Sequence, residues 1–391
     1  MRNKILAAVI AGVVASALTA SAHAADKLKI GFIATLSGPG AHLGESLRDG
    51  FTLAVDELGG KVGGLPTEIS TNDAQLKPDV GRQIAEKLVK RDHVDVVTGI
   101  IFSNVMLALY NTVVDSKTIL IGSNAGPSKI AGPNCSPYFF STSWQNDMPH
   151  AAVGEYVQQQ GVKRVFLIAS NYAAGQDALA GFKSRYKGQI VGELYPAIGQ
   201  LDYAAEIAQI AATQPDAVYA FIASSQAVNF LRQYSEAGLM KKVPLYSAFM
   251  IYALTLPQIG DLGLGARSAA FWTPDLDNEQ TRHFVAAFRK KYNTMPSVFS
   301  AQAYDSVYLI DAAVREIHGK VEDKQAFIKA LEHANYKSLR GPYRYNKNHF
   351  PIENFYATVI AKSPEWGLYE KNTGLIIKDF QDAYAHECPM K

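Results

Sequence analysis

The chain has 391 residues, with 38 lysines and arginines against 36 aspartates and glutamates. At roughly 150 residues per domain, this length predicts two or three folding units. Apolar residues make up 48% and charged residues 19%, which is typical of a globular protein and excludes disordered, collagen-like and coiled-coil classes. The net charge of +2, without a basic tail or run, excludes an electrostatic footprint for nucleic acid.

The first 24 residues are typical of a cleaved secretory signal peptide. Arg2 and Lys4 precede an apolar run, and residues 21–24 (SAHA) place small side chains at the cleavage site. Cleavage after Ala24 leaves 391 − 24 = 367 residues with a net charge of +2 − 2 = 0. The alternative, a membrane anchor, requires about 20 apolar residues. We therefore predict export to the periplasm, with no later membrane span and no lipid anchor.

The two cysteines, Cys135 and Cys388, both lie in loop-like sequences. In an oxidising compartment they predict one disulfide that fixes the C-terminal tail, and two free thiols are the alternative. Their spacing does not indicate a zinc site, so no metal is expected.

In chain order, short β-branched runs alternate with amphipathic helical segments from residue 27 onward. On the first expected helix, Leu43, Leu47 and Phe51 share one face. The first half predicts strands at 27–35, 66–72, 94–100 and 117–122, with helices at 41–58, 80–90 and 105–114. This alternation implies a parallel sheet with helices on both faces.

The same alternation restarts after residue 147. It predicts strands at 163–170, 189–196, 217–224 and 243–249, with helices at 150–159, 176–185, 203–212 and 227–237. A mainly helical part through residue 334 and two strands, at 355–363 and 374–380, complete the chain. Two α/β halves therefore stand in tandem, and ligands are expected at the carboxyl ends of their strands.

Small polar residues follow five of the expected strands, each just before a helix. These loops lie at residues 36–38, 101–104, 123–126, 170–172 and 223–225. Helix N-termini present free backbone N–H groups, which favour an anionic ligand group. For any single serine or asparagine the alternative is helix capping. Five such loops, shared between two halves, predict a binding cleft.

The sequence contains no recognisable catalytic constellation or cofactor motif. Residues 37–44 (SGPGAHLG) approximate a dinucleotide fingerprint, but the glycine spacing is wrong and an exported protein is not supplied with nicotinamide cofactors. The strongest carboxylate pair, Asp56 and Glu57, diverges by about 100° on a helix, which favours a solvated face. No P-loop, zinc-protease motif or nucleophile elbow is present, and the nine histidines are scattered. We therefore expect no enzyme and no cofactor.

Several segments, in order and over nearly the whole exported chain, resemble the periplasmic leucine/isoleucine/valine-type binding proteins of ABC importers. They include SGPGAHLGESLRDGFTLAVDELGG, NDAQLKPDVGRQIAEKLV, TGIIFSNVMLA, ILIGSNAGPS, PYFFSTSWQND, NFLRQYSEAGL and AQAYDSVYLIDAA. The resemblance implies two Rossmann-like lobes joined by three hinge crossovers, with a ligand held between them and no catalysis. Lobe one is expected to comprise residues 25–143 and 276–347, and lobe two residues 144–275 and 348–391.

The resemblance also implies site residues. Ser103 stands where the family has the serine that meets the ligand carboxylate, and Asn124, Ala125 and Gly126 form the next loop around the ligand. The chain departs from the amino-acid binders at several of these positions. Gly126 replaces a threonine, Leu43 an aromatic residue and Ala174 a tyrosine, and the loop containing Ser224 and Ser225 lacks the acid that meets an α-ammonium group.

These departures predict a neutral, roomier pocket that accepts a carboxylate without an amine. The sequences of the segments SNAGPS and SWQND also resemble the aromatic-acid branch of the family. We therefore hypothesise an aromatic acid ligand, such as a hydroxybenzoate or phenylpropenoate. Six rings are candidates for the lining, although packing in the core is the alternative for each of them: Phe102, Tyr172, Phe249, Tyr252, Trp272 and Tyr304.

The expected function is ligand capture by hinge closure, by a monomer that delivers a small carboxylate to the membrane permease of an ABC importer. The alternatives are a branched-chain amino-acid binding protein of the same family and a ligand-sensing module for a receptor. A secreted α/β enzyme is a third alternative, but it would need an activated nucleophile, base or metal.

Overall fold

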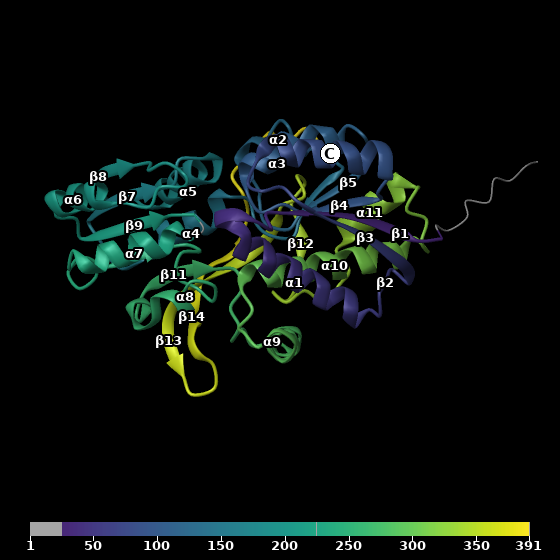
Figure 1. The fold of residues 1–391 in the computed structure, drawn as a ribbon. Coiled ribbons are helices and arrows are strands. Elements are labelled where there is room, and N and C mark those ends of the chain that lie inside the picture. Colours follow the sequence, from purple (N-terminus) through teal and green to yellow (C-terminus); the bar gives the residue numbers. More distant parts are fainter. Residues whose placement is uncertain (1–25, 224, 391) are drawn as a thin grey trace, which may run out of the picture.

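The computed structural model describes residues 26–223 and 225–390, so the predicted signal peptide lies outside the described residues. Two α/β lobes stand side by side, each built on its own sheet (Figure 1). Within the described residues, no helix has the length and apolar character of a membrane span. The same residues contain no group of three or more His, Cys, Asp or Glu side chains arranged to hold a metal ion.

Lobe one is built on a six-stranded sheet of order β2-β3-β1-β4-β5-β6. Its strands are β1 (Leu28–Ala34), β2 (Lys61–Val62), β3 (Leu65–Asp73), β4 (Val96–Gly99), β5 (Ile119–Gly122) and β6 (Phe139–Ser141). Its helices are α1 (Ala41–Glu57), α2 (Pro78–Lys87), α3 (Ser103–Val114), α9 (Glu279–Tyr292), α10 (Val298–Glu316) and α11 (Lys324–His333). The predicted face of Leu43, Leu47 and Phe51 on α1 is buried.

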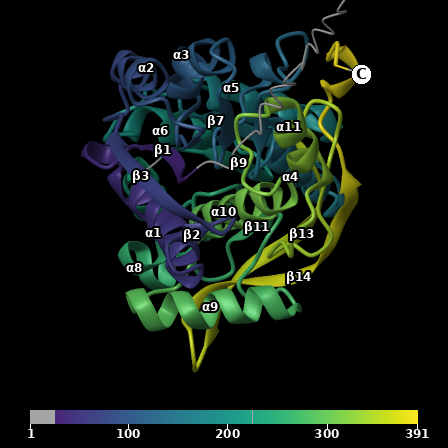
Figure 2. The ribbon, with the colours of Figure 1, turned by 90° about the vertical axis from the view of Figure 1, so that its right-hand side faces the viewer.

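Lobe two contains a parallel sheet that is continued by antiparallel strands. Its strands are β7 (Arg164–Ala169), β8 (Gln189–Leu194), β9 (Ala217–Phe221), β10 (Leu245–Ser247), β11 (Arg267–Ala270), β12 (Arg344–Tyr345), β13 (Pro351–Ser363) and β14 (Gly367–Phe380). Its helices are α4 (Asp147–Gln159), α5 (Ala173–Arg185), α6 (Ala204–Thr213), α7 (Gln226–Glu236) and α8 (Leu256–Ile259). The β13–β14 hairpin runs along one edge of the molecule (Figure 2).

The two parallel sheets have the same strand order, β3-β1-β4-β5-β6 in lobe one and β8-β7-β9-β10-β11 in lobe two. Each sheet therefore changes winding direction between its first and third strands, which is the place where doubly wound sheets bind ligands. The predicted tandem α/β halves are confirmed. The sequence reading missed β6 and β11.

The chain passes between the lobes at three places: after β6, after β11, and between α11 and β13. The exact lobe limits stay predictions. After β14 the tail returns to lobe one, where Cys388 forms a disulfide with Cys135, with the two Cα atoms 5.7 Å apart. The predicted pairing of the two cysteines is therefore confirmed.

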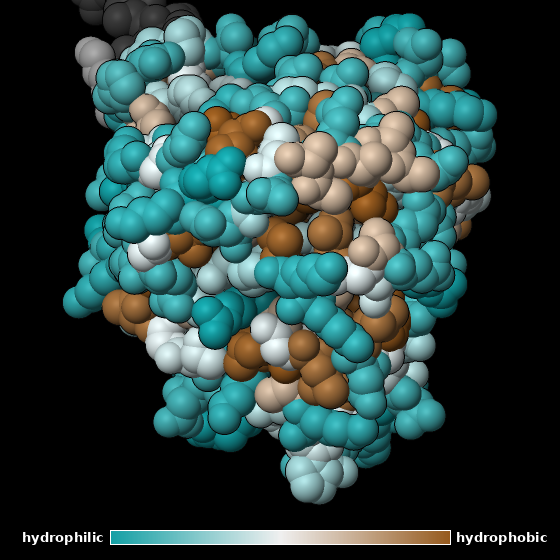
Figure 3. Space-filling view, turned by 90° about the vertical axis from the view of Figure 1, so that its left-hand side faces the viewer, coloured by the Kyte–Doolittle hydropathy of each residue, from teal (hydrophilic) through white to brown (hydrophobic). Residues whose placement is uncertain are grey.

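The described surface exposes few large hydrophobic side chains. On the face shown in Figure 3, hydrophobic residues form separated groups among hydrophilic ones. Among residues 26–223 and 225–390, the exposed large hydrophobic side chains are Leu201, Leu262, Leu264 and Leu375.

Candidate functional site

A cavity lies between the lobes, with about 540 Å³ of empty space that includes its open mouth. Both lobes and the first crossover contribute to its wall. The lining residues are Leu43, Ile101, Phe102, Ser103, Asn124, Trp144, Asn146, His150, Tyr172, Ala174, Phe221, Ile222, Ala223, Phe249, Tyr252 and Phe299.

Most of these residues follow the carboxyl ends of parallel strands. Residues 101–103 follow β4, Asn124 follows β5, Tyr172 follows β7 and residues 222–223 follow β9. In both sheets the lining loops therefore flank the switch point, as the sequence predicted.

The loop after β4 has an unusual backbone that aims it at the cavity. Ile100 has φ 62°, a left-handed conformation that β-branched residues rarely adopt. Gly99 has φ 104°, and a Cβ there would lie 2.2 Å from the Ile33 carbonyl oxygen, so only glycine fits. Strain of this kind concentrates at functional sites, and here it immediately precedes Phe102 and Ser103.

Ser103 is buried, and its hydroxyl proton is free to be donated into the cavity. The Asn146 amide donates from Nδ2 to Ser103 Oγ over 3.0 Å, and no described residue accepts a bond from that hydroxyl. Ser103 is also the first residue of α3, whose first internal bond runs from Met106 N to Phe102 O. The first amides of α3 therefore point outward and favour an anionic group beside Ser103.

Lobe two presents a second helix N-terminus to the same cavity. Ala174 is the second residue of α5, whose first internal bond runs from Gln176 N to Tyr172 O. The small side chain leaves that end of the helix open to the cavity, where its free amides favour an anion.

Seven aromatic rings wall the cavity. Phe249 stacks on Trp144 with ring centroids 4.5 Å apart and an interplanar angle of 13°. The Tyr172 ring lies 6.3 Å from both Phe102 and Phe221. Tyr252 and Phe299 complete the set, with centroids 5.8 Å apart. Such walls favour a flat, apolar ligand body.

No Lys, Arg, Asp or Glu occurs among the described lining residues. Asp177 on α5 is bonded to a lining residue: it accepts bonds from Asn146 Nδ2 (2.9 Å), and also from Ser128 Oγ (2.6 Å) and Ser128 N (3.1 Å). Its oxygens therefore connect lobe two to the loop of Ser128 in lobe one instead of facing the cavity. A ligand ammonium group would have no carboxylate partner in this lining.

His150, on α4, is the one titratable nitrogen base in the described lining. Its Nδ1 forms a hydrogen bond with the hydroxyl of Tyr219. Burial lowers the pKa of His150 to about 3, so the ring is neutral at ordinary pH. The centroid of the His150 ring lies 4.7 Å from that of Phe221 and 6.2 Å from that of Phe249.

Two rings of the predicted lining lie elsewhere. Trp272 is buried outside the cavity lining, and its Nε1 donates to Thr281 Oγ1 over 3.0 Å. Tyr304 faces a separate groove on the outside of lobe one, and its hydroxyl donates to Glu57. Trp272 follows β11 and Tyr304 lies within α10, and the sequence alone does not show which side of its element each ring faces.

The predicted serine and glycine loops are also only partly in the lining. The Ala125 amide is used in a bond to the Ile100 carbonyl. A Cβ on Gly126 would lie 2.1 Å from the Trp144 carbonyl oxygen, so replacing a threonine by glycine opens no space for a ligand. Ser225 is outside the cavity and donates to Pro39 O across the cleft (3.4 Å). Ser224 lies outside the described residues.

The predicted residues that the cavity does bring together are Leu43, Phe102, Ser103, Asn124, Tyr172, Ala174, Phe249 and Tyr252. The sequence reading missed Trp144, Asn146 and His150, which come from the first crossover and the start of α4. Trp144 and Asn146 belong to the SWQND segment, which is part of the family resemblance. The position of this segment between the two halves could have indicated that it borders the cleft. A lone histidine on a helix gave none.

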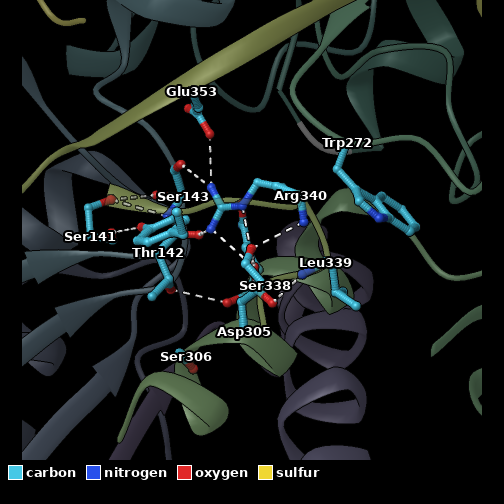
Figure 4. A network of polar contacts seen from close by, with 12 residues as sticks. Ser141, Thr142, Ser143, Trp272, Asp305, Ser306, Ser338, Leu339, Arg340 and Glu353 are labelled. Carbon is cyan, nitrogen blue, oxygen red and sulfur yellow. Dashed lines mark hydrogen bonds and ion pairs between the residues drawn. The ribbon is translucent and has the colours of Figure 1, made fainter. Parts of the chain in front are cut away.

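The crossovers themselves are held by Arg340 (Figure 4). All five of its N–H groups are used: two reach the Thr142 and Ser143 carbonyls, two reach Asp305 and one reaches Glu353. The side chains of Arg340, Asp305 and Glu353 are at most 5% exposed.

This hinge network is connected to the cavity wall. Ser143 donates from Oγ to the Asn124 carbonyl over 2.8 Å, and Trp144, the next residue, lines the cavity. Arg340 therefore fixes the segment that brings Trp144 and Asn146 to the cavity.

Comparison with known proteins places this geometry among binding proteins. The family described as periplasmic binding protein matches residues 27–364. The chain is 27% identical to the Leu/Ile/Val-binding protein homolog 6 of Brucella suis over 367 residues, covering 90% of this chain and 93% of that protein.

Two solved structures are closely similar in fold. One is an ABC transporter solute binding protein from R. palustris in complex with benzoate, with a TM-score of 0.88, 29% identity and coverage of 93% of this chain and 100% of that one. The other is a solute binding protein from Rhodopseudomonas palustris BisB5 in complex with 3,4-dihydroxy benzoic acid. Its TM-score is 0.86 at 27% identity, with 92% and 99% of the two chains covered.

Proposed function

Because the chain belongs to the family of periplasmic binding proteins, we propose that it is the substrate-binding component of an ABC importer and that its ligand is an aromatic carboxylate. The observation that supports this ligand class best is the composition of the cavity. Seven rings surround it, and no charged side chain occurs among its described lining residues. Two similar structures hold benzoates, which agrees with this ligand class.

The carboxylate belongs at the Ser103 end of the cavity. The Ser103 hydroxyl and the first amides of α3 supply neutral donors, and the N-terminus of α5 adds a favourable dipole from lobe two. The aromatic body then lies between the rings, including the Trp144–Phe249 stack.

Ligand capture proceeds by closure of the two lobes. A ligand at Ser103 touches lobe one first and gains contacts with lobe two only when the cleft closes, so it shifts the population toward the closed form. The bonds from Ser128 to Asp177 and from Ser225 to Pro39 cross the cleft and stabilise that form. The closed form, a monomer in the periplasm, would then be recognised by the membrane permease.

A branched-chain amino-acid ligand is the second candidate, because the chain is similar to a Leu/Ile/Val-binding protein homologue. This candidate requires a carboxylate beside the α-ammonium group. Asp177 is bonded to the lining residue Asn146, but its oxygens are engaged by Asn146 and Ser128. A sensing module for a receptor would use the same cavity and the same closure.

The test is a thermal-shift screen of the exported protein against benzoates, cinnamates, branched-chain amino acids and short fatty acids. A ligand that binds only the folded state raises the Tm, because it stabilises that state. At a ligand concentration of 100 times the Kd, this stabilisation is about 2.7 kcal/mol. We expect benzoates or cinnamates to raise the Tm. Stabilisation by leucine or valine alone would overturn the proposed ligand class.

A further inference from the structure

His150 has one ring nitrogen in use and one free. Nδ1 is bonded to the Tyr219 hydroxyl, and Nε2 has no hydrogen-bond partner among residues 26–223 and 225–390. His150 is only 2% exposed, but its Nε2 atom is not completely enclosed by protein atoms. Since His150 lines the cavity, Nε2 borders the cavity itself.

The Tyr219 hydroxyl decides which nitrogen carries the proton. Tyr219 is fully buried and its hydroxyl has no other partner among the described residues, so its own proton must go to His150 Nδ1 to be satisfied. Burial raises the pKa of Tyr219 well above its usual range, which keeps that proton in place. In this tautomer His150 Nε2–H is a neutral donor directed at the cavity.

A neutral donor in an aromatic wall, unpaired and almost fully buried, costs free energy until a ligand atom pairs with it. The ligand atom must be a hydrogen-bond acceptor such as an oxygen, because Nε2 carries a proton in this tautomer. The remaining question is which oxygen of the ligand reaches it.

Distance along α4 answers this. Asn146, which bonds Ser103 at the carboxylate end, precedes α4, and His150 lies four residues further along, a rise of about 6 Å along the helix axis. A single benzene ring spans a similar distance from its carboxyl carbon to a hydroxyl in the para position. One ligand can therefore place its carboxylate at Ser103 and a ring hydroxyl at His150.

We propose that His150 binds a ring hydroxyl of the ligand, so that the cavity selects para-hydroxylated aromatic acids over unsubstituted benzoate. This inference rests on the proposed function, since it assumes an aromatic carboxylate in the cavity. It makes His150 a specificity-determining residue and distinguishes between the benzoate and the dihydroxybenzoate held by the two similar structures.

The experiment is isothermal titration of the exported protein with benzoate and with 4-hydroxybenzoate. We expect 4-hydroxybenzoate to bind about tenfold more tightly, which corresponds to one hydrogen bond. In His150→Phe the ratio of the two Kd values should fall to about one or below, because an apolar ring leaves the hydroxyl unpaired.

Three further variants keep the test decisive. His150→Gln retains an N–H donor and should retain part of the preference. Tyr219→Phe removes the group that orients His150 and should reduce the ratio even where His150→Phe fails to fold. His349→Phe is the matched control, since His349 is a buried histidine whose bonds to Phe139 and Glu332 lie outside the cavity, and its ratio should equal that of the unmodified protein.

Two results would overturn the inference. One is an unchanged ratio in His150→Phe, and the other is an equal loss of both acids, which would place the carboxylate on His150. Failure of the unmodified protein to bind either acid would instead overturn the proposed function.

Discussion

The hinge around Arg340 and the cavity beside Ser103 are both buried between the lobes, but their hydrogen-bond donors differ. At the hinge every N–H of Arg340 meets a carboxylate or carbonyl oxygen of the protein. In the cavity, the Ser103 hydroxyl proton and His150 Nε2–H have no acceptor among the described residues. The difference separates a region that fixes shape from one that awaits a ligand.

The largest effect is expected where the hinge is broken. Arg340→Met should lower the free energy of unfolding by about 3–5 kcal/mol, because it leaves Asp305 and Glu353 buried without their cation. Urea unfolding of the purified protein measures this change. The control is Arg315→Met, which breaks the half-exposed pair with Asp311 and should cost less than about 1 kcal/mol. Equal losses in the two variants would mean that the hinge network is not a structural centre.

The disulfide is the next largest contribution, and it acts on the tail instead of the hinge. Replacing Cys135 and Cys388 by serine should lower the free energy of unfolding by about 2–4 kcal/mol. Unfolding of the oxidised protein with and without reductant provides the same comparison without a mutation. A double variant as stable as the oxidised protein would contradict this estimate.

The cavity should respond in affinity rather than in stability. Ser103→Ala should weaken aromatic-acid binding by about 1.5–3 kcal/mol, the value of a hydrogen bond to a charged group. Ser116→Ala is the matched control, since Ser116 lies beyond the opposite end of α3 and donates to the Val113 carbonyl outside the cavity. Titration calorimetry should show a change below about threefold for Ser116→Ala, and a larger effect there than at position 103 would refute the placement of the carboxylate.

The smallest effect concerns pH. Because the pKa of His150 is about 3 in the folded protein and about 6.5 when unfolded, only the unfolded state takes up a proton between these values. Stability should therefore fall as the pH drops below 6.5, by about 1.4 kcal/mol at pH 5.5 from this residue. The difference between the unmodified protein and His150→Gln, measured by urea unfolding at pH 7.5 and 5.5, isolates this contribution. A pH response that is the same in both would show that His150 titrates normally.

Much of the fold could be predicted because its pattern is local. The alternation of apolar runs and helical faces located the two halves, and the small polar loops after the strands located the cleft. Ser103 and Asn124 followed from the resemblance together with those loops. Gly126 was placed in the right loop, but only the structure shows that the Trp144 carbonyl leaves no room there for a larger residue.

The remaining site residues depend on contacts between distant segments. Trp272 and Tyr304 are aromatic residues like those that line the cavity, and their local sequence does not distinguish them. Their side chains are instead held by hydrogen bonds to Thr281 and Glu57, respectively. His150 became recognisable only through its bond to Tyr219, which lies 69 residues further along the chain. A single sequence contains no signal for such a pairing.

The central claim is that this cavity accepts a carboxylate and rejects an α-ammonium group. Phenylacetate and phenylglycine share one carbon skeleton and differ by that ammonium group alone, so their Kd values, measured by calorimetry at pH 7, test the claim most directly. We predict that phenylacetate binds at least about 100-fold more tightly, since an unpaired buried ammonium costs several kcal/mol. Equal or tighter binding of phenylglycine would contradict the account and identify the protein as an amino-acid binder.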